Sequence, residues 1–373
     1  MSLSLRLIEH LKDLESLRAQ WDELASRANA GLYQTWEWTF ASAKYHSDMD
    51  RLYILTAWDG SQLVGAASFV WRVHNRRLVT TRDLQPLGAT HPETVEILAA
   101  EEYSRAVAER LAAHLTREAF WDRLLLNSIP TDSPATAHFL SIMQDQGHHI
   151  SPHTGRPLLV VRLPLSFDDY LSTLHRKTRK NLLWKARHLA KHCMVEELPP
   201  DQDLAEPLRR FLELHDLRWR ILQRRSLLAD QRLRSFYGEI AQLLHKRGWL
   251  RLTFLRSESR YIAAELVIWY NGRAYARQSG LDVSGAWARY SPGLILTLKN
   301  IQRAIQGGLR EFRLGLGDEP YKRDFGPEEI PTTNYRIVSR ALETRAKLLF
   351  DALVQRTRKA VRTVVASSQA GGA

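Results

Sequence analysis

Residues 251–282, RLTFLRSESRYIAAELVIWYNGRAYARQSGLD, decide the fold of the second half of the chain. The apolar segments in this stretch are rich in β-branched and aromatic residues, which is typical of strands. Asn271-Gly272 favours a tight hairpin turn, because both residues tolerate a positive φ. The stretch therefore predicts three antiparallel strands.

Strand and helix patterns alternate along the rest of the chain, which is typical of an α/β or α+β protein. Residues 52–75 predict two strands joined at Asp59-Gly60, and residues 121–129 predict another strand. A strand pattern at 310–316 follows the last expected helix. Helices are expected near 102–119, 133–147, 168–192 and 231–246, from about Leu204, and from Ser291-Pro292 onward.

The two halves of the chain resemble each other. A shift of 197 positions lays the hairpin at 55–76 on residues 252–273 without a gap. This shared pattern predicts two copies of one α/β unit. At this shift Glu265 has Ser68 as its counterpart, so we expect an acid on this strand in the second copy alone.

A Pro- and Gly-containing loop at 151–157 separates the halves. The sequence therefore predicts an N-terminal lobe at 1–157 and a C-terminal lobe at 158–340. Residues 341–373 predict a basic amphipathic helix followed by a disordered tail. Docking on the body, contact with acidic lipid and contact with a partner protein through 341–365 are the alternatives for this helix.

The charge favours anionic partners, since 53 Lys and Arg against 41 Asp and Glu give a formal net charge of +12. A single cysteine, Cys193, excludes a disulfide framework within the chain and a cysteine-based zinc site. No motif predicts a metal site, and no long uncharged apolar run predicts a membrane span or a signal peptide. We therefore expect a cytoplasmic protein without a bound metal.

The segment that begins at Tyr290, YSPGLILTLKNIQRAI, is typical of a helix N-terminus that binds phosphate. Ser291 is a good N-cap, Pro292 suits the first helical position, and Gly293 keeps side-chain bulk away from the free amides. Arg289 adds positive charge. A plain capped helix is the alternative interpretation.

The same region is similar to a known family. The run from Tyr290 through Gly307-Gly308-Leu309 to GLGDEPYKRDF at 315–325 resembles the C-terminal half of the CelD-like, cellulose-biosynthesis acetyltransferases of the GNAT superfamily. Residues 214–219 match the family's His-x-x-Arg-Trp segment. The basic residues Arg176, Arg179 and Lys180 resemble its opening helix, and Trp36-Glu37-Trp38 resembles the aromatic entry of its first lobe.

The resemblance covers about residues 30–335 and implies two tandem GNAT-like lobes, each a mixed, mostly antiparallel sheet flanked by helices. It implies that the second lobe binds acetyl-CoA or another acyl-CoA. The residues that would bind this co-substrate are Arg289, Tyr290, Ser291 and Gly293. The family's usual Gln/Arg-x-x-Gly-x-Gly/Ala loop is absent, and Arg313 stands where relatives usually carry Asp.

Acyl transfer from a thioester to an amine needs a proton acceptor, donors for the oxyanion and an acid for the leaving thiolate. Glu265 is the predicted base, and a solvent-facing acid paired with Arg273 or Arg277 is the alternative. Tyr321 is the predicted acid, and a packing aromatic is the alternative. His215 is a third catalytic candidate, with a hydrogen-bonded core histidine as the alternative.

Further side chains are expected to bind the acceptor, and packing or turn chemistry is the alternative for each of them. These residues are Arg218, Trp219, Asp318, Lys322 and Arg179.

We therefore expect an acyltransferase that moves an acetyl group from acetyl-CoA to an amine or a sugar-linked acceptor. The resemblance suggests a role in cell-envelope or exopolysaccharide biosynthesis. One alternative is a Fem-type transferase that uses aminoacyl-tRNA, with RNA bound by the basic segment 176–191. Another is a non-catalytic GNAT-fold scaffold that binds a partner or an acidic membrane surface.

Overall fold

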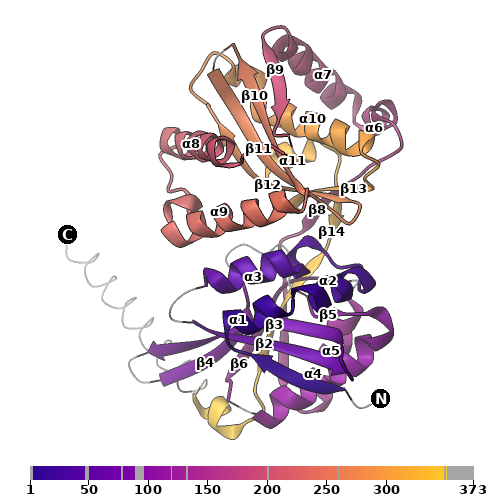
Figure 1. Ribbon diagram of the computed structural model, residues 1–373, viewed down its shortest axis with the longest axis vertical. Coiled ribbons are helices and arrows are strands. Elements are labelled where there is room, and N and C mark those ends of the chain that lie inside the picture. The colour runs from indigo at the N-terminus through magenta and orange to yellow at the C-terminus, as the bar shows by residue number, and fades with distance from the viewer. Residues whose placement is uncertain are drawn as a thin grey trace, which may run out of the picture. The chain divides into compact units, whose positions relative to one another are not determined.

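The computed structural model describes residues 3–46, 50–76, 79–88, 96–118, 120–131, 133–199, 201–258, 260–347 and 350 (Figure 1). It contains two mixed, mostly antiparallel sheets flanked by helices, as expected. Unit 1 comprises Met1–Ala28, Ser47–Thr154 and Thr333–Ala373, and unit 2 comprises Asn29–His46 and Gly155–Thr332. These limits differ from the sequence-based ones at 29–46, 155–157 and 333–373.

The described part of unit 1 forms an eight-stranded sheet. Its strands follow the order β1 (Ser4–Ile8), β2 (Asp50–Asp59), β3 (Gln62–Arg76), β4 (Val79–Pro86), β6 (Arg123–Pro130), β15 (Thr332–Val338) and β7 (His149–Thr154), and β5 (Leu98–Ala99) pairs with β3. Its helices are α1 (Leu11–Ser16), α2 (Arg18–Arg27), α4 (Ser104–Glu118) and α5 (Pro134–Asp145).

The described part of unit 2 forms a seven-stranded sheet. Its strands follow the order β14 (Glu328–Ile330), β8 (Leu158–Arg162), β13 (Glu311–Leu316), β12 (Arg273–Leu281), β11 (Arg260–Tyr270), β10 (Leu250–Ser257) and β9 (Cys193–Glu197). Its helices are α3 (Trp36–Lys44), α6 (Phe167–Thr173), α7 (Arg176–Ala190), α8 (Ala205–Ile221), α9 (Gln231–Lys246), α10 (Pro292–Gln306) and α11 (Pro320–Arg323).

Helices cover both faces of the unit 2 sheet (Figure 1). Successive side chains of a strand point to opposite faces. Ala264 and Leu266 of β11 pack into the core that α8 and α9 share, whereas Ala263 and Val267 pack into the core that α10 shares. The side chain of Glu265 therefore lies on the α10 face.

The predicted three-stranded stretch forms β10, β11 and β12, with Asn271 and Gly272 at φ 51° and 70° in the expected turn. The single helix expected at 168–192 is instead two helices, α6 and α7. Leu174 between them has an extended backbone and is buried in the core, and His175 caps α7 by accepting from the backbone N–H of Lys177. The apolar spacing predicted the helical residues but not this break.

The two units share their strand order and a β-bulge. The register of the paired strands, however, aligns the units with a shift one residue larger than the shift of 197 taken from the sequence. The bulged residue is Val64 in the β2–β3 pair and Ile262 in the β10–β11 pair, which corresponds to a shift of 198. Ala67, not Ser68, is therefore the structural counterpart of Glu265. Ala67 is a buried core residue, so the acid still has no acidic counterpart in unit 1.

Strands β12 and β13 run parallel and pair over only three residue pairs, from Arg273–Glu311 to Tyr275–Arg313. Beyond Tyr275, β12 continues to Leu281 without pairing to β13, and the register of β11 and β12 shifts between Leu266 and Val267. The two strands are thus unpaired beyond Tyr275, and Ser279, which pairs with Glu265 of β11, lies in the unpaired part of β12.

Residues 342–347 begin the expected C-terminal helix. Thr344 donates a 2.6 Å hydrogen bond to the fully buried Asp122 of unit 1. The rest of the predicted helix and tail, within 341–373, lies largely outside the described residues. In the described part of the chain, no helix combines the length and apolarity that crossing a membrane requires.

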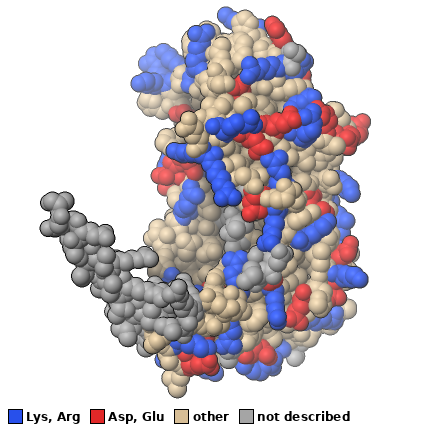
Figure 2. Space-filling model, turned by 90° about the vertical axis from the view of Figure 1, so that its left-hand side faces the viewer, with Lys and Arg blue, Asp and Glu red and all other residues tan. Residues whose placement is uncertain are grey.

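Positive charge is spread widely over one face of the described residues. On the face drawn in Figure 2, Lys and Arg side chains occur over most of the described surface, with Asp and Glu between them. A specific anion site therefore has to be argued from local groups of residues rather than from the net charge.

Candidate functional site

Glu265 lies in the interior of unit 2, where its side chain is 6% exposed. Both carboxylate oxygens accept hydrogen bonds from α10: Thr297 Oγ1 donates over 2.8 Å and Asn300 Nδ2 over 2.7 Å. Asn300 Nδ2 also lies 2.9 Å from Thr253 Oγ1 on β10. The alternative expectation for Glu265, a solvent-facing acid paired with a strand arginine, is therefore wrong.

Burial raises the pKa of Glu265 to about 7, although the hydrogen bonds from Asn300 and Thr297 act in the opposite direction. A carboxyl group with a pKa near neutrality gains and loses a proton easily at physiological pH. This property suits a general base. The catalytic role of Glu265 stays a prediction that its acidity and position support.

Tyr321 lies on α11 and is about half exposed. Partial burial, together with the charges of Glu265 and Glu319, raises the pKa of Tyr321 to about 12, so its hydroxyl keeps its proton at neutral pH. The positive charge of Arg218 on α8 acts to lower the pKa of Tyr321. Arg218 also donates a hydrogen bond to Ser279 Oγ over 2.9 Å. The electrostatic effects on Tyr321, together with the pairing of Ser279 and Glu265 across β12 and β11, put Glu265, Tyr321 and Arg218 in one neighbourhood.

His215 is buried on α8 and has both ring nitrogens engaged. Trp219 Nε1 donates to His215 Nε2 over 3.1 Å, and His215 Nδ1 lies 3.3 Å from Ser226 Oγ. Burial lowers the pKa of His215 to about 4, so the ring is neutral at pH 7. A Cβ at Gly280 would lie 2.6 Å from the backbone nitrogen of His215, so β12 and α8 are in close contact here. This geometry favours the alternative of a hydrogen-bonded core histidine.

The turn before α10 differs from the expected cap. Pro292 does open the helix, but Ser291 adopts φ 51° and its side chain caps no backbone amide. Instead, Ser291 Oγ accepts from Lys185 Nζ over 2.9 Å. The room beside Gly293 is taken by Leu281, whose Cδ2 would lie 2.7 Å from an added Cβ. Gly293 is therefore needed for packing against β12, and its role in access to the helix end stays a prediction.

Three of the expected acceptor-binding residues make other contacts. Lys322 is buried and donates to Leu316 O over 2.9 Å, and it also forms an ion pair with Glu319. Arg179 donates to Leu171 O over 3.4 Å, and the exposed Asp318 forms an ion pair with Arg323 at 3.7 Å. These contacts hold local structure, and they do not place the three residues beside Glu265.

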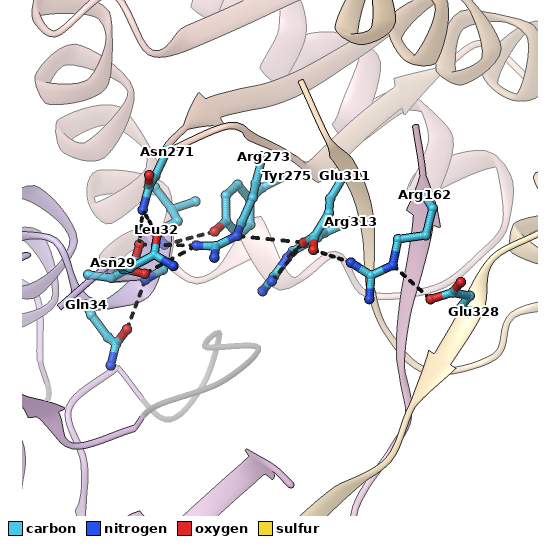
Figure 3. Close-up of polar contacts among 12 residues, drawn as sticks. Asn29, Leu32, Gln34, Arg162, Asn271, Arg273, Tyr275, Glu311, Arg313 and Glu328 are labelled. Atoms are coloured by element: carbon cyan, nitrogen blue, oxygen red, sulfur yellow. Dashed lines mark hydrogen bonds and ion pairs between the residues drawn. The ribbon is translucent and has the colours of Figure 1, made fainter. Parts of the chain in front are cut away.

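Arg313 belongs to a polar network at the start of β13 (Figure 3). Arg313 and Arg273 lie 3.0 and 3.8 Å from Glu311, and Arg162 also pairs with this carboxylate. Burial opposes ionisation of Glu311, but Arg313 and the other two arginines hold its pKa below the ordinary value. Arg313 thus helps to neutralise an acid two residues earlier on the same strand.

The segment at 29–34 is held against β12 in the same network. Leu32 N donates to Tyr275 Oη over 3.3 Å, and Asn271 Nδ2 donates to Asn29 Oδ1 over 2.7 Å (Figure 3). These contacts explain why 29–46 belongs to unit 2.

Sequence reasoning missed Thr297, Asn300 and Ser279, which contact the proposed base or its neighbour. A signal for two of them exists, because Thr297 and Asn300 are polar residues spaced i, i+3 on the otherwise apolar face of α10. Among the described residues, no group of three or more His, Cys, Asp and Glu could hold a metal ion.

The stretch 176–323 contains this whole neighbourhood, and it matches the family model for the acetyltransferase (GNAT) domain. This part of the chain is similar to GNAT-type acetyltransferase domains. The narrower CelD-like assignment stays a prediction.

Solved structures share the fold over most of the chain. The crystal structure of FemX has a TM-score of 0.61 at 12% identity, covering 90% of this chain and 97% of that one. L-PGS from Bacillus licheniformis has a TM-score of 0.53 at 11% identity, covering 90% and 96%. A tandem GNAT protein from the clavulanic acid biosynthesis pathway has a TM-score of 0.50 at 15% identity, covering 91% and 99%. At these identities the likeness establishes the fold alone. No curated protein sequence matches the chain significantly.

Proposed function

We propose that unit 2 transfers an acyl group, acetyl in the first instance, from acyl-CoA to an amine or a sugar-linked acceptor. The observation that carries this proposal is Glu265, a buried carboxyl with a pKa of about 7 in a stretch that matches the GNAT domain. Burying a carboxylate is costly, and perturbed acids of this kind gather at functional sites.

The neighbouring side chains supply the remaining chemistry. Glu265 takes a proton from the acceptor ammonium through a water molecule, because α10 holds both of its oxygens. The acceptor nitrogen then bonds to the thioester carbon and the carbon–sulfur bond breaks. Tyr321, which keeps its proton at neutral pH, protonates the leaving thiolate. The acceptor nitrogen then loses its second proton through water to the Tyr321 phenolate, which leaves a neutral amide and a reprotonated tyrosine. Arg218 lies in the same neighbourhood as Glu265 and Tyr321, where it binds an anionic group of the acceptor.

The turn before α10 has a donor set that fits a diphosphate. The first N–H groups of a helix, here those of Gly293 and Leu294, have no partner within the helix, and the helix dipole favours an anion there. Lys185 and Arg289 add positive charge on the same side, Lys185 through its bond to Ser291. Acyl-CoA bound at this turn supplies the thioester.

Calorimetry of the full chain with acetyl-CoA, followed by a thiol-release assay with a panel of amine acceptors, tests the proposal. Glu265→Gln should lower kcat by about 10²- to 10⁴-fold with an unchanged dissociation constant for acetyl-CoA. Glu213→Gln, the same change at an exposed position of α8, should alter neither value. Full activity of Glu265→Gln would remove Glu265 from the reaction.

A Fem-type transferase that uses aminoacyl-tRNA is the second candidate. Helix α7 favours it, because the helix is rich in Lys and Arg and contains no acid, which suits an RNA backbone. Retention of tRNA with a steep salt dependence, in a chain that does not bind acetyl-CoA, would select this candidate. Binding of acetyl-CoA without turnover of any acceptor would favour the non-catalytic scaffold.

The role in envelope or exopolysaccharide metabolism rests on the CelD-like resemblance of the sequence. Including amino-sugar acceptors in the amine panel tests it, since such a role requires turnover of a sugar-linked amine.

A further inference from the structure

An aromatic surface lies on α7 and on the short turn η4 (Ala288–Tyr290) that precedes α10. We call it the α7–η4 surface. Trp184 and His188 lie one helical turn apart on α7, with ring centroids 4.2 Å apart. His188 stacks on Tyr290 at 5.6 Å with an interplanar angle of 13°, and Trp184 lies 5.7 Å from the same ring. Close to them, His192 lies 5.5 Å from Trp287.

Trp184 is 49% exposed, which is unusual for a tryptophan that also packs against two rings. His188 Nδ1 bonds to Trp184 O over 2.8 Å, so the ring below the indole is held in place. One part of the indole is thus supported while another remains open. A supported, open indole is a platform on which a flat ring can stack.

The surface is also cationic. Arg187, Lys191 and Arg289 are exposed, and none of the three forms an ion pair with a residue in the described part of the chain. The two segments that build the surface, 174–195 and 283–310, contain no Asp or Glu. An anionic ligand therefore meets no carboxylate from either segment.

The surface adjoins the turn where the diphosphate is proposed to bind. Tyr290 directly precedes Ser291, and Lys185 of α7 donates to Ser291 Oγ over 2.9 Å. Helix α7 contacts both η4 and α10, and Figure 1 shows α7 beside α10. A ligand that places a diphosphate on the turn can thus place its neighbouring groups on the α7–η4 surface.

A stacking platform and unpaired cations together select a ligand with a flat ring and phosphate groups, which is the chemistry of a nucleotide. We propose that the α7–η4 surface binds the 3′-phosphoadenosine end of coenzyme A, with the adenine on Trp184 and the 3′-phosphate among Arg187, Lys191 and Arg289. This inference rests on the proposed function, since coenzyme A is the nucleotide that an acyl transfer at Glu265 would use.

The first test uses adenosine 3′,5′-bisphosphate, which contains the adenosine end and no thioester. Its binding to the full chain should quench tryptophan fluorescence, and Trp184→Ala should remove most of the quench and weaken binding by about tenfold or more. Arg187→Ala/Lys191→Ala should weaken binding and flatten its salt dependence. The charge-matched Arg110→Ala/Lys246→Ala, at exposed positions of α4 and α9, should change neither. Equal effects of the two double variants would overturn the proposal.

The second test compares acetyl-CoA with S-acetylpantetheine, which lacks the adenosine end. Trp184→Ala should lower kcat/KM for acetyl-CoA by about tenfold or more and leave kcat/KM for S-acetylpantetheine unchanged. Trp184→Phe should restore part of the loss, because the phenyl ring still stacks. Equal losses with both substrates would overturn the proposal, since they would indicate a general structural effect.

The two tests separate this inference from the proposed function. Trp184-dependent binding of the bisphosphate in a chain that transfers no acyl group would uphold the nucleotide surface and reject the acyltransferase. Acetyl transfer that is insensitive to Trp184, Arg187 and Lys191 would uphold the acyltransferase and overturn the surface. Quenching by tRNA that the bisphosphate does not compete away would also overturn the assignment to coenzyme A.

Discussion

Glu265→Gln should stabilise the protein in neutral and basic solution, and the size of the effect follows from the pKa of the carboxyl. Burial raises this pKa from 4.5 to about 7. In the unfolded chain the carboxyl loses its proton near its ordinary pKa, whereas in the folded chain it keeps the proton until about pH 7. The wild-type protein therefore loses stability as pH rises from about 4.5 through 7. At about 1.4 kcal/mol for each pKa unit, the loss is about 3 kcal/mol.

Glutamine has the same shape and does not titrate, so the variant should not show this loss. Thr297 Oγ1 lies 3.2 Å from Gly293 O and can turn its hydroxyl there, which lets it accept from the new amide. Urea unfolding of both proteins at pH 4 and pH 8 measures the effect. The free energy of unfolding of the variant relative to wild type should rise by about 3 kcal/mol between the two pH values. A difference that does not change with pH would refute the burial argument.

Three further substitutions test other contacts. Tyr321→Phe removes the proposed acid and should lower kcat by about 10²-fold or more at an unchanged dissociation constant for acetyl-CoA, measured by thiol release and calorimetry; an unchanged kcat would exclude the acid role. Thr297→Val removes a donor that lowers the pKa of Glu265, so the acidic limb of the profile of kcat/KM against pH should move to higher pH; an unmoved limb would contradict this coupling. Thr344→Val removes a donor to the buried Asp122 and should cost about 1–3 kcal/mol in urea unfolding; unchanged stability would show that the contact contributes little.

Local signals in the sequence were sufficient for most of the elements around the site. Asn271-Gly272 predicts its turn because the conformation depends on those two residues alone, and Pro292 predicts the first turn of α10 for the same reason. The break between α6 and α7 had no such signal. It depends on Leu174, which is buried by residues distant in sequence. The same holds for 29–46, which hydrogen bonds from Leu32 and Asn271 hold in unit 2.

In the candidate site, too, local signals predict some features, and contacts between distant residues determine the others. Glu265 could be singled out because a strand acid without an acidic counterpart is unusual. In the structure the counterpart is Ala67 rather than Ser68, and it is also not acidic. The partners of Glu265 could not be predicted, since Thr297 and Asn300 reach it through the packing of α10 on β11. For Ser291 the local signal was misleading. Serine often caps a helix, but here its hydroxyl caps no backbone amide and accepts a hydrogen bond from Lys185 instead.

Glu265→Gln is expected to raise stability and to lower activity, and a comparison of the two units explains how one substitution can do both. The cross-strand pair that is Thr253 and Glu265 in unit 2 is Leu55 and Ala67 in unit 1, where both residues are buried and apolar. The same strand order is therefore built without an acid, and the fold itself does not require Glu265. Because the carboxyl of Glu265 is expected to lower stability by about 3 kcal/mol at pH 8, the proposed role in the reaction accounts for its presence better than a role in folding does. If Glu265→Gln proved both more stable and fully active, this reasoning would fail at its central step.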